Sequence, residues 1–515
     1  MKNRIIYILL ILFLIKLSAE AQKFKNITAV VYPQNIPIIK GVASNPILKM
    51  SIHVPKKCID SVLTNIECQL GKGEYSVIDK VTVYETSSEH FSSDNKLVSV
   101  APVSDRFSIP IDFKLMQGLH FLWISVELRQ SSDINGMLTL NTLEVKSKNG
   151  VRFPVIQTPG DYSRIKGVVV RKSGDNNVDT YRIPGIVKTK KGTLLSVYDI
   201  RYKNGKDLPN NIDVGLSKSI DGGETWKPMQ VIMDMGTPHE NNGVGDPAIL
   251  YDPYNERIWV AALWSKGNRS IAGSLPGLSP DTTGQLVLVY SDDDGESWSR
   301  PESIITMTKN PKWHLYFNGP GKGIAMKNGT LVFAAQYWDE NKIPHATIFY
   351  SKDHGDNWIG KIEGPKSNTT ESQVVETAQG TLMLNMRDNR GGYRSVATTD
   401  DMGEHWIEHA SSFQTLIDPI CMGSIIDATV YIKDSNKNVL FFSNPNTKNG
   451  RYNITIKAST DNGDTWPSKN SFLIDERICY GYSCLTALDK KTIGILYEGA
   501  KDLYFVKVPV GLIIK

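Results

Sequence analysis

The chain has 515 residues, of which 40% are hydrophobic and 22% are charged, and its formal net charge is +4 at pH 7. This length is too great for one ordinary hydrophobic core, so we expect two or three domains, or one large repeat architecture with an appended domain. The nearly neutral charge gives no reason to expect nucleic-acid or membrane binding, and 41 Gly and 25 Pro with few helix-period patterns favour an all-β chain.

The N-terminus reads MKNRIIYILLILFLIKLSAEAQK, with Lys2 and Arg4 ahead of an apolar run and small residues at Ala19 and Ala21. This pattern predicts a secretory signal peptide over residues 1–21, because the apolar run is too short for a membrane span and a lysine interrupts it. No other apolar run is long enough to cross a bilayer. We therefore expect an exported protein, periplasmic or extracellular, without a transmembrane span.

Cysteine is sparse, and the sequence lacks the common metal and nucleotide motifs. The five cysteines are Cys58, Cys68, Cys421, Cys479 and Cys484. An odd number over this length is not a disulfide framework. Cys58 and Cys68 either form a disulfide bridge across a short loop or are free thiols. No CxxC, HExxH or P-loop pattern occurs. We therefore predict neither a metal nor an organic cofactor.

Residues 22–155 show the alternation of a small β-sandwich. Stretches such as AVVYPQNIPIIKG, SVIDKVTVYE and HFLWISVELR are separated by polar turns. The segment NGVRFPVIQTPGDYS at 149–163, with two Pro and two Gly, is typical of a linker. We therefore predict an N-terminal β-sandwich domain at 22–155 and a second domain at 156–515.

An eight-residue pattern, S/T-x-D-x-G-x-x-W, recurs five times in the second domain. Its copies are SIDGGETW at 219–226, SDDDGESW at 291–298, SKDHGDNW at 351–358, TDDMGEHW at 399–406 and STDNGDTW at 459–466. Each follows a strand-like run, so we expect it at the turn that ends a strand. The Gly suits a turn that needs positive φ, and the Asp can accept hydrogen bonds from backbone N–H groups of that turn.

The spacing of these octets predicts a β-propeller. Their mean spacing is about 60 residues, so residues 156–515 hold six such repeats of several short strands each. The blade without an octet is expected where the two ends of the domain meet, through GVVVRK near 167–172 and LYFVKV near 503–508. The fold class is therefore all-β: a six-bladed β-propeller with an N-terminal β-sandwich.

The octets themselves are interpreted as structure and not as catalytic sites. A catalytic site is built once, whereas this pattern occurs five times, so we expect Asp to cap each turn and Trp to pack between neighbouring sheets. His354 is then a turn residue, because the other octets have Gly, Asp, Met and Asn at its position. Function should lie in residues that differ between blades, on loops at one end of the propeller.

Arginines near strand ends are the first such residues, and their motifs carry a family resemblance. YRIPG at 181–185 followed by the octets closely resembles the bacterial exo-sialidases (neuraminidases) of the six-bladed propeller type, over essentially all of residues 156–515. In that family three arginines bind the carboxylate of sialic acid. By motif they resemble Arg182 in YRIP, Arg394 in YRSVATTDD and Arg451 in GRYNITIKASTD. A guanidinium suits this role because it pairs with a carboxylate in bidentate fashion and keeps its charge.

Three further residues resemble the family's substrate-binding positions. Arg201 in DIRY resembles an arginine beside the cluster, and Asp246 in GVGDPAIL resembles the aspartate that reads the N-acyl arm of the sugar. Glu498 in ILYEG resembles the glutamate that holds the first arginine in place.

The resemblance also implies three catalytic residues. Tyr482 in GYSCL resembles the nucleophile and Glu376 in ESQVVETAQGTL the glutamate that takes its proton, while the arginines are expected to help lower the pKa of the phenol. A neutral phenol suits an anomeric carbon that bears a carboxylate, since an anionic nucleophile would be repelled. Asp207 in GKDLPNNID resembles the general acid.

Rivals to these assignments stay open. Asp199 and Asp213 compete with Asp207, and Tyr480 competes with Tyr482, although the family motif has Tyr directly before Ser. Trp313, Tyr337 and Trp338 either line a glycan-binding rim or belong to the core. The N-terminal domain either binds carbohydrate, as the resemblance implies, or supports the propeller.

The resemblance implies a secreted retaining exo-sialidase that removes terminal sialic acid from glycoconjugates. One alternative is a trans-sialidase or an intramolecular variant, which shares these residues and differs in what reaches the intermediate. Another is a non-catalytic propeller that binds glycan or protein, but a binding module has no reason to keep the arginines, the tyrosine and the two carboxylates together.

Overall fold

The computed structural model describes residues 27–56, 61–148, 150 and 152–515, and the chain divides into two compact units, Met1–Gly167 and Val168–Lys515. The division falls twelve residues after the predicted domain boundary at 155. The predicted signal peptide and Cys58 lie outside the described residues, whereas Cys68 is a free, buried thiol. Within the described part of the chain, no helix is long and apolar enough to cross a membrane.

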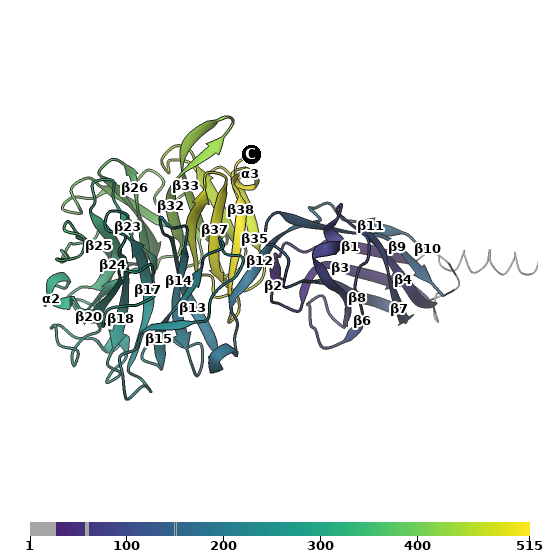
Figure 1. Cartoon of the computed structure of the whole chain (residues 1–515), viewed down its shortest axis with the longest axis horizontal. Coiled ribbons are helices and arrows are strands. Elements are labelled where there is room, and N and C mark those ends of the chain that lie inside the picture. Colours follow the sequence, from purple (N-terminus) through teal and green to yellow (C-terminus); the bar gives the residue numbers. More distant parts are fainter. Residues whose placement is uncertain (1–26, 57–60, 149, 151) are drawn as a thin grey trace, which may run out of the picture. The chain divides into compact units, whose positions relative to one another are not determined.

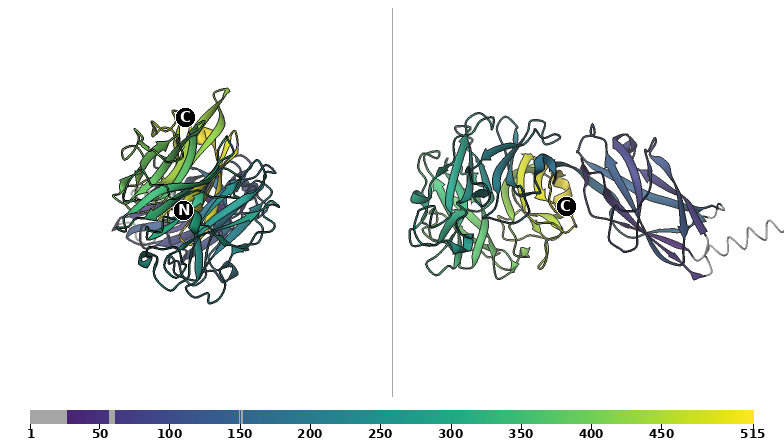
Figure 2. Two further views of the ribbon diagram at one scale, coloured as in Figure 1. Left: turned by 90° about the vertical axis from the view of Figure 1, so that its left-hand side faces the viewer. Right: turned by 90° about the horizontal axis from the view of Figure 1, so that it is seen from below.

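The first unit contains two sheets, which can be followed in purple and blue in Figure 2. One sheet has the order β11-β1-β3-β8-β5-β6, and the other contains β9, β4 and β7, with β10 paired to β9. The strands of this unit are β1 (Thr28–Pro33), β2 (Ile38–Lys40), β3 (Asn45–Val54), β4 (Ser61–Leu70), β5 (Ile78–Thr86), β6 (Lys96–Val100), β7 (Arg106–Leu115), β8 (Gly118–Leu128), β9 (Met137–Ser147), β10 (Arg152–Phe153) and β11 (Val155–Gln157). A short 3-10 helix, η2 (Glu74–Val77), precedes β5.

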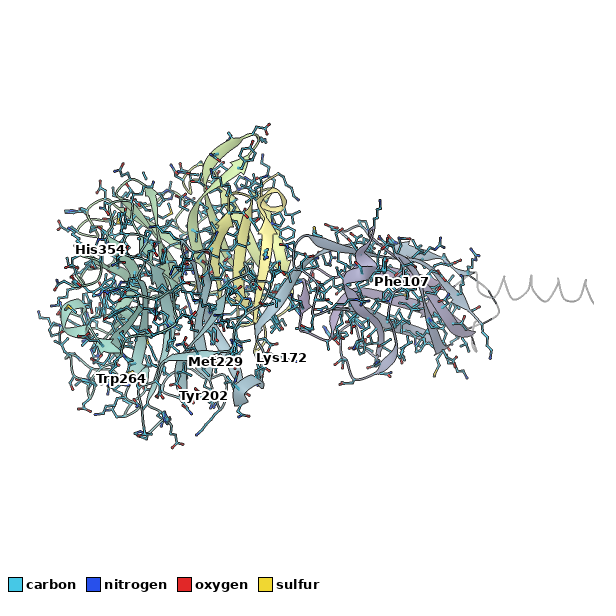
Figure 3. All side chains as sticks on the ribbon, viewed as in Figure 1. Phe107, Lys172, Tyr202, Met229, Trp264 and His354 are labelled. Atoms are coloured by element: carbon cyan, nitrogen blue, oxygen red, sulfur yellow. The ribbon has the colours of Figure 1, made fainter. Side chains whose placement is uncertain are left out.

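One hydrophobic core lies between these two sheets. Along β7 buried and exposed residues alternate strictly, so that Phe107, labelled in Figure 3, and every second residue after it point to the same side. Ile52 and Ile124 from the other sheet belong to the same buried cluster. The alternation read from the sequence therefore produces a β-sandwich.

The second unit contains six larger sheets, five of which are built from strands close together in the sequence, and one separate two-stranded sheet (Figure 1). Their strands are β13 (Thr180–Lys188), β14 (Leu194–Arg201), β15 (Ile212–Ser219) and β16 (Gln230–Met233); β17 (Gly243–Tyr251), β18 (Ile258–Ser265), β19 (Gln285–Ser291) and β20 (Glu302–Ser303); β21 (Leu315–Asn318), β23 (Ile324–Ala325), β24 (Leu331–Trp338) and β25 (Pro344–Ser351); β26 (Thr369–Ala378), β27 (Thr381–Asp388), β29 (Ser395–Thr399) and β30 (Ile407–Glu408); and β32 (Ser424–Ile432), β33 (Ser435–Pro445), β34 (Ile454–Ser459) and β35 (Ser471–Asp475).

Smaller elements complete these sheets. β22 (Gly321–Lys322) pairs in parallel with β17, and β28 (Gly392–Tyr393) pairs with β31 (Ile417–Asp418). The helices of this unit are short: η3 (Asp175–Asn177), η4 (Ile271–Gly273), α2 (Ile305–Thr308) and α3 (Val510–Ile513).

The sixth sheet joins the two ends of the propeller, as predicted. It contains β36 (Ser483–Asp489), β37 (Thr492–Glu498) and β38 (Leu503–Pro509), and β38 has β12 (Ser163–Arg171) as its other neighbour (Figure 1). This is the one sheet of the six without an octet. The prediction of a six-bladed propeller closed through GVVVRK and LYFVKV is confirmed.

The octets form the predicted turns. In each of the other five sheets one strand, namely β15, β19, β25, β29 or β34, ends on the Ser or Thr that opens the octet. In the first copy the hydroxyl of Ser219 accepts a hydrogen bond from Gly223 N at 2.8 Å, and Asp221 accepts one from Thr225 N at 3.0 Å. The octet glycines have positive φ, with Gly223 at 91°. The Asp therefore caps the turn, as the sequence predicted.

The variable fourth position of the octet has a role that the sequence did not reveal. His354, labelled in Figure 3, has φ of 58°, and its Nδ1 lies 2.7 Å from Oδ2 of the buried Asp252 in the preceding sheet. At the same position Asp294 accepts a hydrogen bond from Thr193 of the sheet before it at 2.7 Å. Together with Trp358, whose ring packs edge-on against Trp259 of that preceding sheet, these contacts join neighbouring blades.

Candidate active site

Tyr482 lies directly before the first strand of the last sheet and points its hydroxyl at a carboxylate from a different blade. Its phenol oxygen is 2.5 Å from both carboxylate oxygens of Glu371, which lies on β26 of the fourth sheet. The tyrosine is only 5% exposed. The ring and the carboxylate are therefore a preformed pair in which a phenolic proton can pass to an adjacent base.

The predicted pairing of Tyr482 with Glu376 is wrong. Glu376 lies five residues further along β26, where its two carboxylate oxygens accept hydrogen bonds from the backbone N–H groups of Lys327 and Gly380, each at 2.9 Å. Five residues of extended strand span roughly 16 Å. Glu376 therefore joins turns of the third and fourth sheets, and Glu371 takes the place beside the tyrosine.

The pKa of Tyr482 is raised well above its usual value, which is the reverse of the direction expected from the arginines. Burial is the largest cause and the carboxylate of Glu371 is the next, while Arg387 and Arg182 act in the opposite direction without prevailing. The pKa of Glu371 itself is lowered: burial acts to raise it, but Arg387 and the hydrogen bond from Tyr482 outweigh burial. The site therefore holds a neutral phenol beside an ionised carboxylate.

Arg182 enters the site from β13, the first strand of the first sheet. Its Nε donates to Glu498 Oε1 at 3.1 Å, and its Cζ lies 5.2 Å from the ring centre of Tyr482. Glu498 also accepts hydrogen bonds from the backbone N–H groups of Ile183 at 2.9 Å and of Tyr482 at 2.8 Å. The predicted contact between Glu498 and Arg182 is present, and the same carboxylate fixes the backbone of the tyrosine.

Two further arginines surround the phenol. Arg451 has its Cζ 5.6 Å from the ring centre of Tyr482, and it donates to the backbone carbonyls of Tyr480 at 2.9 Å and Ile420 at 3.1 Å. Arg387, on β27, donates from Nη1 to Glu371 Oε2 at 2.6 Å and to the Tyr482 hydroxyl at 3.1 Å. Three guanidinium groups from three different sheets therefore converge on one phenol.

The predicted third arginine, Arg394, does not belong to this cluster. Its side chain is 0% exposed, and it donates to the side chain of Asn385 at 2.8 Å and pairs with Asp418 at 3.6 Å. Arg387 stands seven residues earlier and takes the place that the resemblance implied for Arg394. The segment NMRDN around Arg387 carries no motif that distinguished it in the sequence.

Asp207 is the exposed carboxylate at the edge of this cluster. Its side chain is 79% exposed, and its Oδ1 lies 2.7 Å from Nη1 of Arg201 and 3.4 Å from Nη1 of Arg182. Burial among the neighbouring groups acts to raise its pKa, but the two arginines outweigh this effect, so the pKa of Asp207 is lowered. Before substrate binds, Asp207 is therefore held as a carboxylate.

The rival carboxylates are occupied elsewhere. Asp199 is buried, with one oxygen 2.9 Å from Arg201 Nη2 and the other accepting from Asp246 N at 2.9 Å. Asp213 accepts a hydrogen bond from Tyr202, labelled in Figure 3, at 2.8 Å, and burial raises its pKa to about 6. Neither touches the arginines around Tyr482 as Asp207 does.

Asp246 stands at a strained point of the backbone on the same side of the propeller. Its φ is 56°, its carbonyl accepts from Asn318 Nδ2 at 2.7 Å, and β17 is irregular at this position. Its pKa is raised well above the usual value, first by burial and then by the charges of Asp199 and Glu371. Asp246 therefore lies within electrostatic reach of Glu371 and Asp207.

The aromatic residues considered for a glycan-binding rim belong largely to the core. Trp313 and Tyr337 are both 4% exposed and stack with ring centres 3.8 Å apart. Trp338 is partly buried against a cluster that contains Phe317. Among the described residues, no group of three His, Cys, Asp or Glu side chains is placed to hold a metal ion.

These residues together can bind an anion and carry out proton-coupled substitution. Arg182, Arg387 and Arg451 offer a carboxylate site beside a neutral phenol that has its own base in Glu371. Asp207, at the exposed edge, is placed to exchange a proton with a leaving group or with water.

Two family models match the chain. Residues 183–473 match the model described as "BNR repeat-like domain", and residues 26–150 match the model described as "N-terminal domain of BNR-repeat neuraminidase". The first match covers more than half of the chain.

Similar proteins and structures include several that are named sialidase. The chain is 45% identical over 408 residues to a sialidase of Bacteroides fragilis, covering 76% of this chain and 73% of that protein. It is 33% identical over 342 residues to a sialidase of Micromonospora viridifaciens, covering 63% of this chain and 51% of that protein. The solved structure of "Hadza microbial sialidase Hz136" matches with a TM-score of 0.87 at 36% identity, covering 94% of this chain and all of the other.

Proposed function

Because the chain belongs to the BNR-repeat sialidases, which are glycoside hydrolases, we propose that it is a retaining exo-α-sialidase that acts through a tyrosyl intermediate. Its proposed substrates are terminal α-linked sialic acids on oligosaccharides, glycoproteins and glycolipids. The observation that carries the mechanism is the contact of the Tyr482 phenol with both oxygens of Glu371, 2.5 Å away, inside a ring of three arginines.

In the first step the substrate carboxylate pairs with Arg182, Arg387 and Arg451, which places the anomeric carbon beside Tyr482. The phenol oxygen bonds to this carbon while Glu371 takes the phenolic proton and the bond to the leaving oxygen breaks. Asp207, in its protonated form, gives its proton to that oxygen. Pairing of the substrate with Arg182 weakens the hold of this arginine on Asp207, which favours the protonated acid in the complex.

In the second step the roles of the acid and the nucleophile reverse. Asp207, now a carboxylate, takes a proton from water, and the water oxygen bonds to the anomeric carbon as the bond to Tyr482 breaks. Glu371 returns its proton to the departing phenolate. Two displacements at one carbon leave the sugar with its original anomeric configuration. The raised pKa of Tyr482 is consistent with this scheme. A phenol that ionises with difficulty needs Glu371 to take its proton in the first step and to return it in the second.

The test is release of a fluorophore from an aryl sialoside by the wild type and by Tyr482→Phe. We expect hydrolysis by the wild type and loss of nearly all activity in the variant, because the nucleophilic oxygen is removed and the ring is kept. Tyr431→Phe, at an exposed tyrosine of the fifth sheet, is the control and should be fully active. A wild type without activity would overturn the proposed function, and an active Tyr482→Phe would overturn the assigned nucleophile.

The products decide between hydrolysis and transfer. NMR of the first sugar released should show the α anomer of free sialic acid before it mutarotates, as retention requires. An added lactose acceptor that becomes sialylated in preference to water would identify a trans-sialidase, and a product lacking one water would identify internal transfer. Cleavage of the signal peptide is tested separately, by sequencing the exported protein, whose first residue is expected to be Gln22.

A further inference from the structure

Tyr480 lies two residues before the nucleophile and faces a different part of the site. Among the described carboxylates none hydrogen-bonds to its phenol, whereas Tyr482 contacts Glu371 directly. We infer that Tyr480 is a positioning residue that holds the arginine cluster and the loop of Asp207 in register with each other. This inference rests on the proposed function, and three sets of contacts support it.

The first contact is with Arg182. The Cζ of Arg182 lies 4.3 Å from the ring centre of Tyr480, closer than the 5.2 Å to the ring centre of Tyr482. A guanidinium over an aromatic face is attracted to the ring and stacks on it, which restricts the orientation of the guanidinium. Glu498 fixes Nε of the same arginine, so the ring and the carboxylate together aim the remaining nitrogens into the site.

The second set of contacts comes from the backbone of Tyr480. Its carbonyl accepts the hydrogen bond from Arg451 Nη1 at 2.9 Å, and its N–H donates to the carbonyl of Gly499 at 3.2 Å. Gly499 directly follows Glu498, the partner of Arg182. Tyr480 thus contacts both Arg182 and Arg451 and is hydrogen-bonded to the residue that follows β37.

The third contact is with the loop that carries the acid. A Cβ placed on Gly205 would lie 2.6 Å from the phenol oxygen of Tyr480 and 3.5 Å from its Cζ, so the phenol packs directly on the glycine backbone. The carbonyl of Gly205 accepts from Arg201 Nη1 at 2.7 Å, and the same nitrogen holds Asp207 at 2.7 Å. A side chain at position 205 would therefore push this loop away from the arginine cluster.

The consequence concerns one half of the reaction. Displacement of the loop moves Asp207 away from the leaving oxygen but leaves Tyr482 and Glu371 in place. Substrates with a poor leaving group, such as sialyllactose, need the acid, whereas aryl sialosides leave with little help. Displacement of Asp207 relative to the arginines should therefore appear as a greater dependence of kcat/KM on the leaving group.

The decisive experiment combines Gly205→Ala with Tyr480→Phe. Gly205→Ala should lower kcat/KM for sialyllactose by about 10²-fold, as a displacement near 1 Å does, and should lower it much less for an aryl sialoside. Adding Tyr480→Phe removes the oxygen that the new methyl group meets, so the double variant should recover most of the lost activity. Full activity of Gly205→Ala, or failure of the second substitution to rescue it, overturns the inference.

A second measurement tests the contact with Arg182. Tyr480→Leu should raise KM for both substrates, because Arg182, which binds their carboxylate, loses the aromatic ring on which it stacks. Tyr290→Leu is the matched control, since Arg257 Cζ lies 4.2 Å from that ring in the second sheet, away from the site. Equal KM values in Tyr480→Leu and Tyr290→Leu contradict the inference. A wild type inactive on every sialoside would instead overturn the proposed function.

Discussion

At the scale of residues, β26 carries two glutamates with different tasks. Glu371 holds the phenol of Tyr482, and Glu376 holds two backbone N–H groups at the other end of the strand. Sequence spacing could not separate them, because both lie in the one strand TTESQVVETA and a bulge between Thr369 and Ser372 shifts the register there. Arg387 and Arg394 present the same difficulty, since the burial that removes Arg394 from the site depends on Asn385 and Asp418.

The two glutamates predict opposite outcomes for the same substitution. Glu371→Gln should lower kcat by about 10²–10⁴-fold, because the base is lost, and should leave the unfolding midpoint nearly unchanged. Glu376→Gln should keep kcat and lower the free energy of unfolding by about 1–3 kcal/mol, because one buried N–H loses its acceptor. Steady-state kinetics and thermal unfolding of both variants check this, and a large loss of kcat in Glu376→Gln would restore it as the base.

The charge of Arg201 predicts a pH effect. Arg201 and Arg182 lower the pKa of Asp207 against the effect of burial, so removal of one cation should raise that pKa and keep the acid protonated to higher pH. The alkaline limb of the profile of kcat/KM against pH for sialyllactose should therefore move to higher pH in Arg201→Gln. Arg201→Lys keeps the charge and should keep the limb near its original place. A limb that stays fixed or moves down in Arg201→Gln would exclude Asp207 as the group responsible.

At the scale of elements, the octet is the most predictable part of the molecule. Its hydrogen bonds are local, so five copies of one pattern revealed the turn, the strand that precedes it and the number of blades. The side chains of the proposed site behave differently, because they come from four different sheets and their meeting depends on the closed ring. The family motifs located Arg182, Arg451, Tyr482, Asp207 and Glu498 correctly as neighbours. They failed at the two positions where a second residue of the same type lies five or seven residues away.

The octet aspartates predict sensitivity to acid. The pKa of Asp293 is lowered to about 2, first by the hydroxyl and then by the N–H of Ser297, and that of Asp401 is lowered to about 2, first by the N–H of His405 and then by its side chain. Because the folded pKa lies below the unfolded value of about 4, this stability is complete above pH 4 and is lost as pH falls towards 2.

Asp293→Asn tests this relation. The variant should unfold at a lower temperature than the wild type at pH 7, and the difference should shrink as the pH approaches 2. Asp356→Asn is the control, since its exposed side chain lies outside the octet hydrogen bonds. A difference that is the same at pH 7 and pH 3 would show that the charge of Asp293 does not contribute.

At the scale of the whole molecule, the proposed active site draws on the first, fourth, fifth and sixth sheets of the propeller. Arg182 and Asp207 come from the first sheet, Glu371 and Arg387 from the fourth, Arg451 from the fifth, and Tyr482 from the sixth. No pair of neighbouring blades holds the full set. Catalysis therefore depends on closure of the ring through β12 and β38.

Because the ring closes through residues near both ends of the propeller, the site can assemble only late in synthesis of the chain. The hydrogen bond between Arg182 and Glu498 spans 316 residues, so a ribosome that adds about 5–20 residues per second needs roughly 15–60 s to supply the second partner after the first. During this interval β12 lacks β38, its neighbour in the sixth sheet, and Arg182 lacks its carboxylate partner. A nascent chain that ends before the sixth sheet lacks Tyr482 and Glu498, so we expect it to cleave no sialoside until synthesis of the propeller is complete.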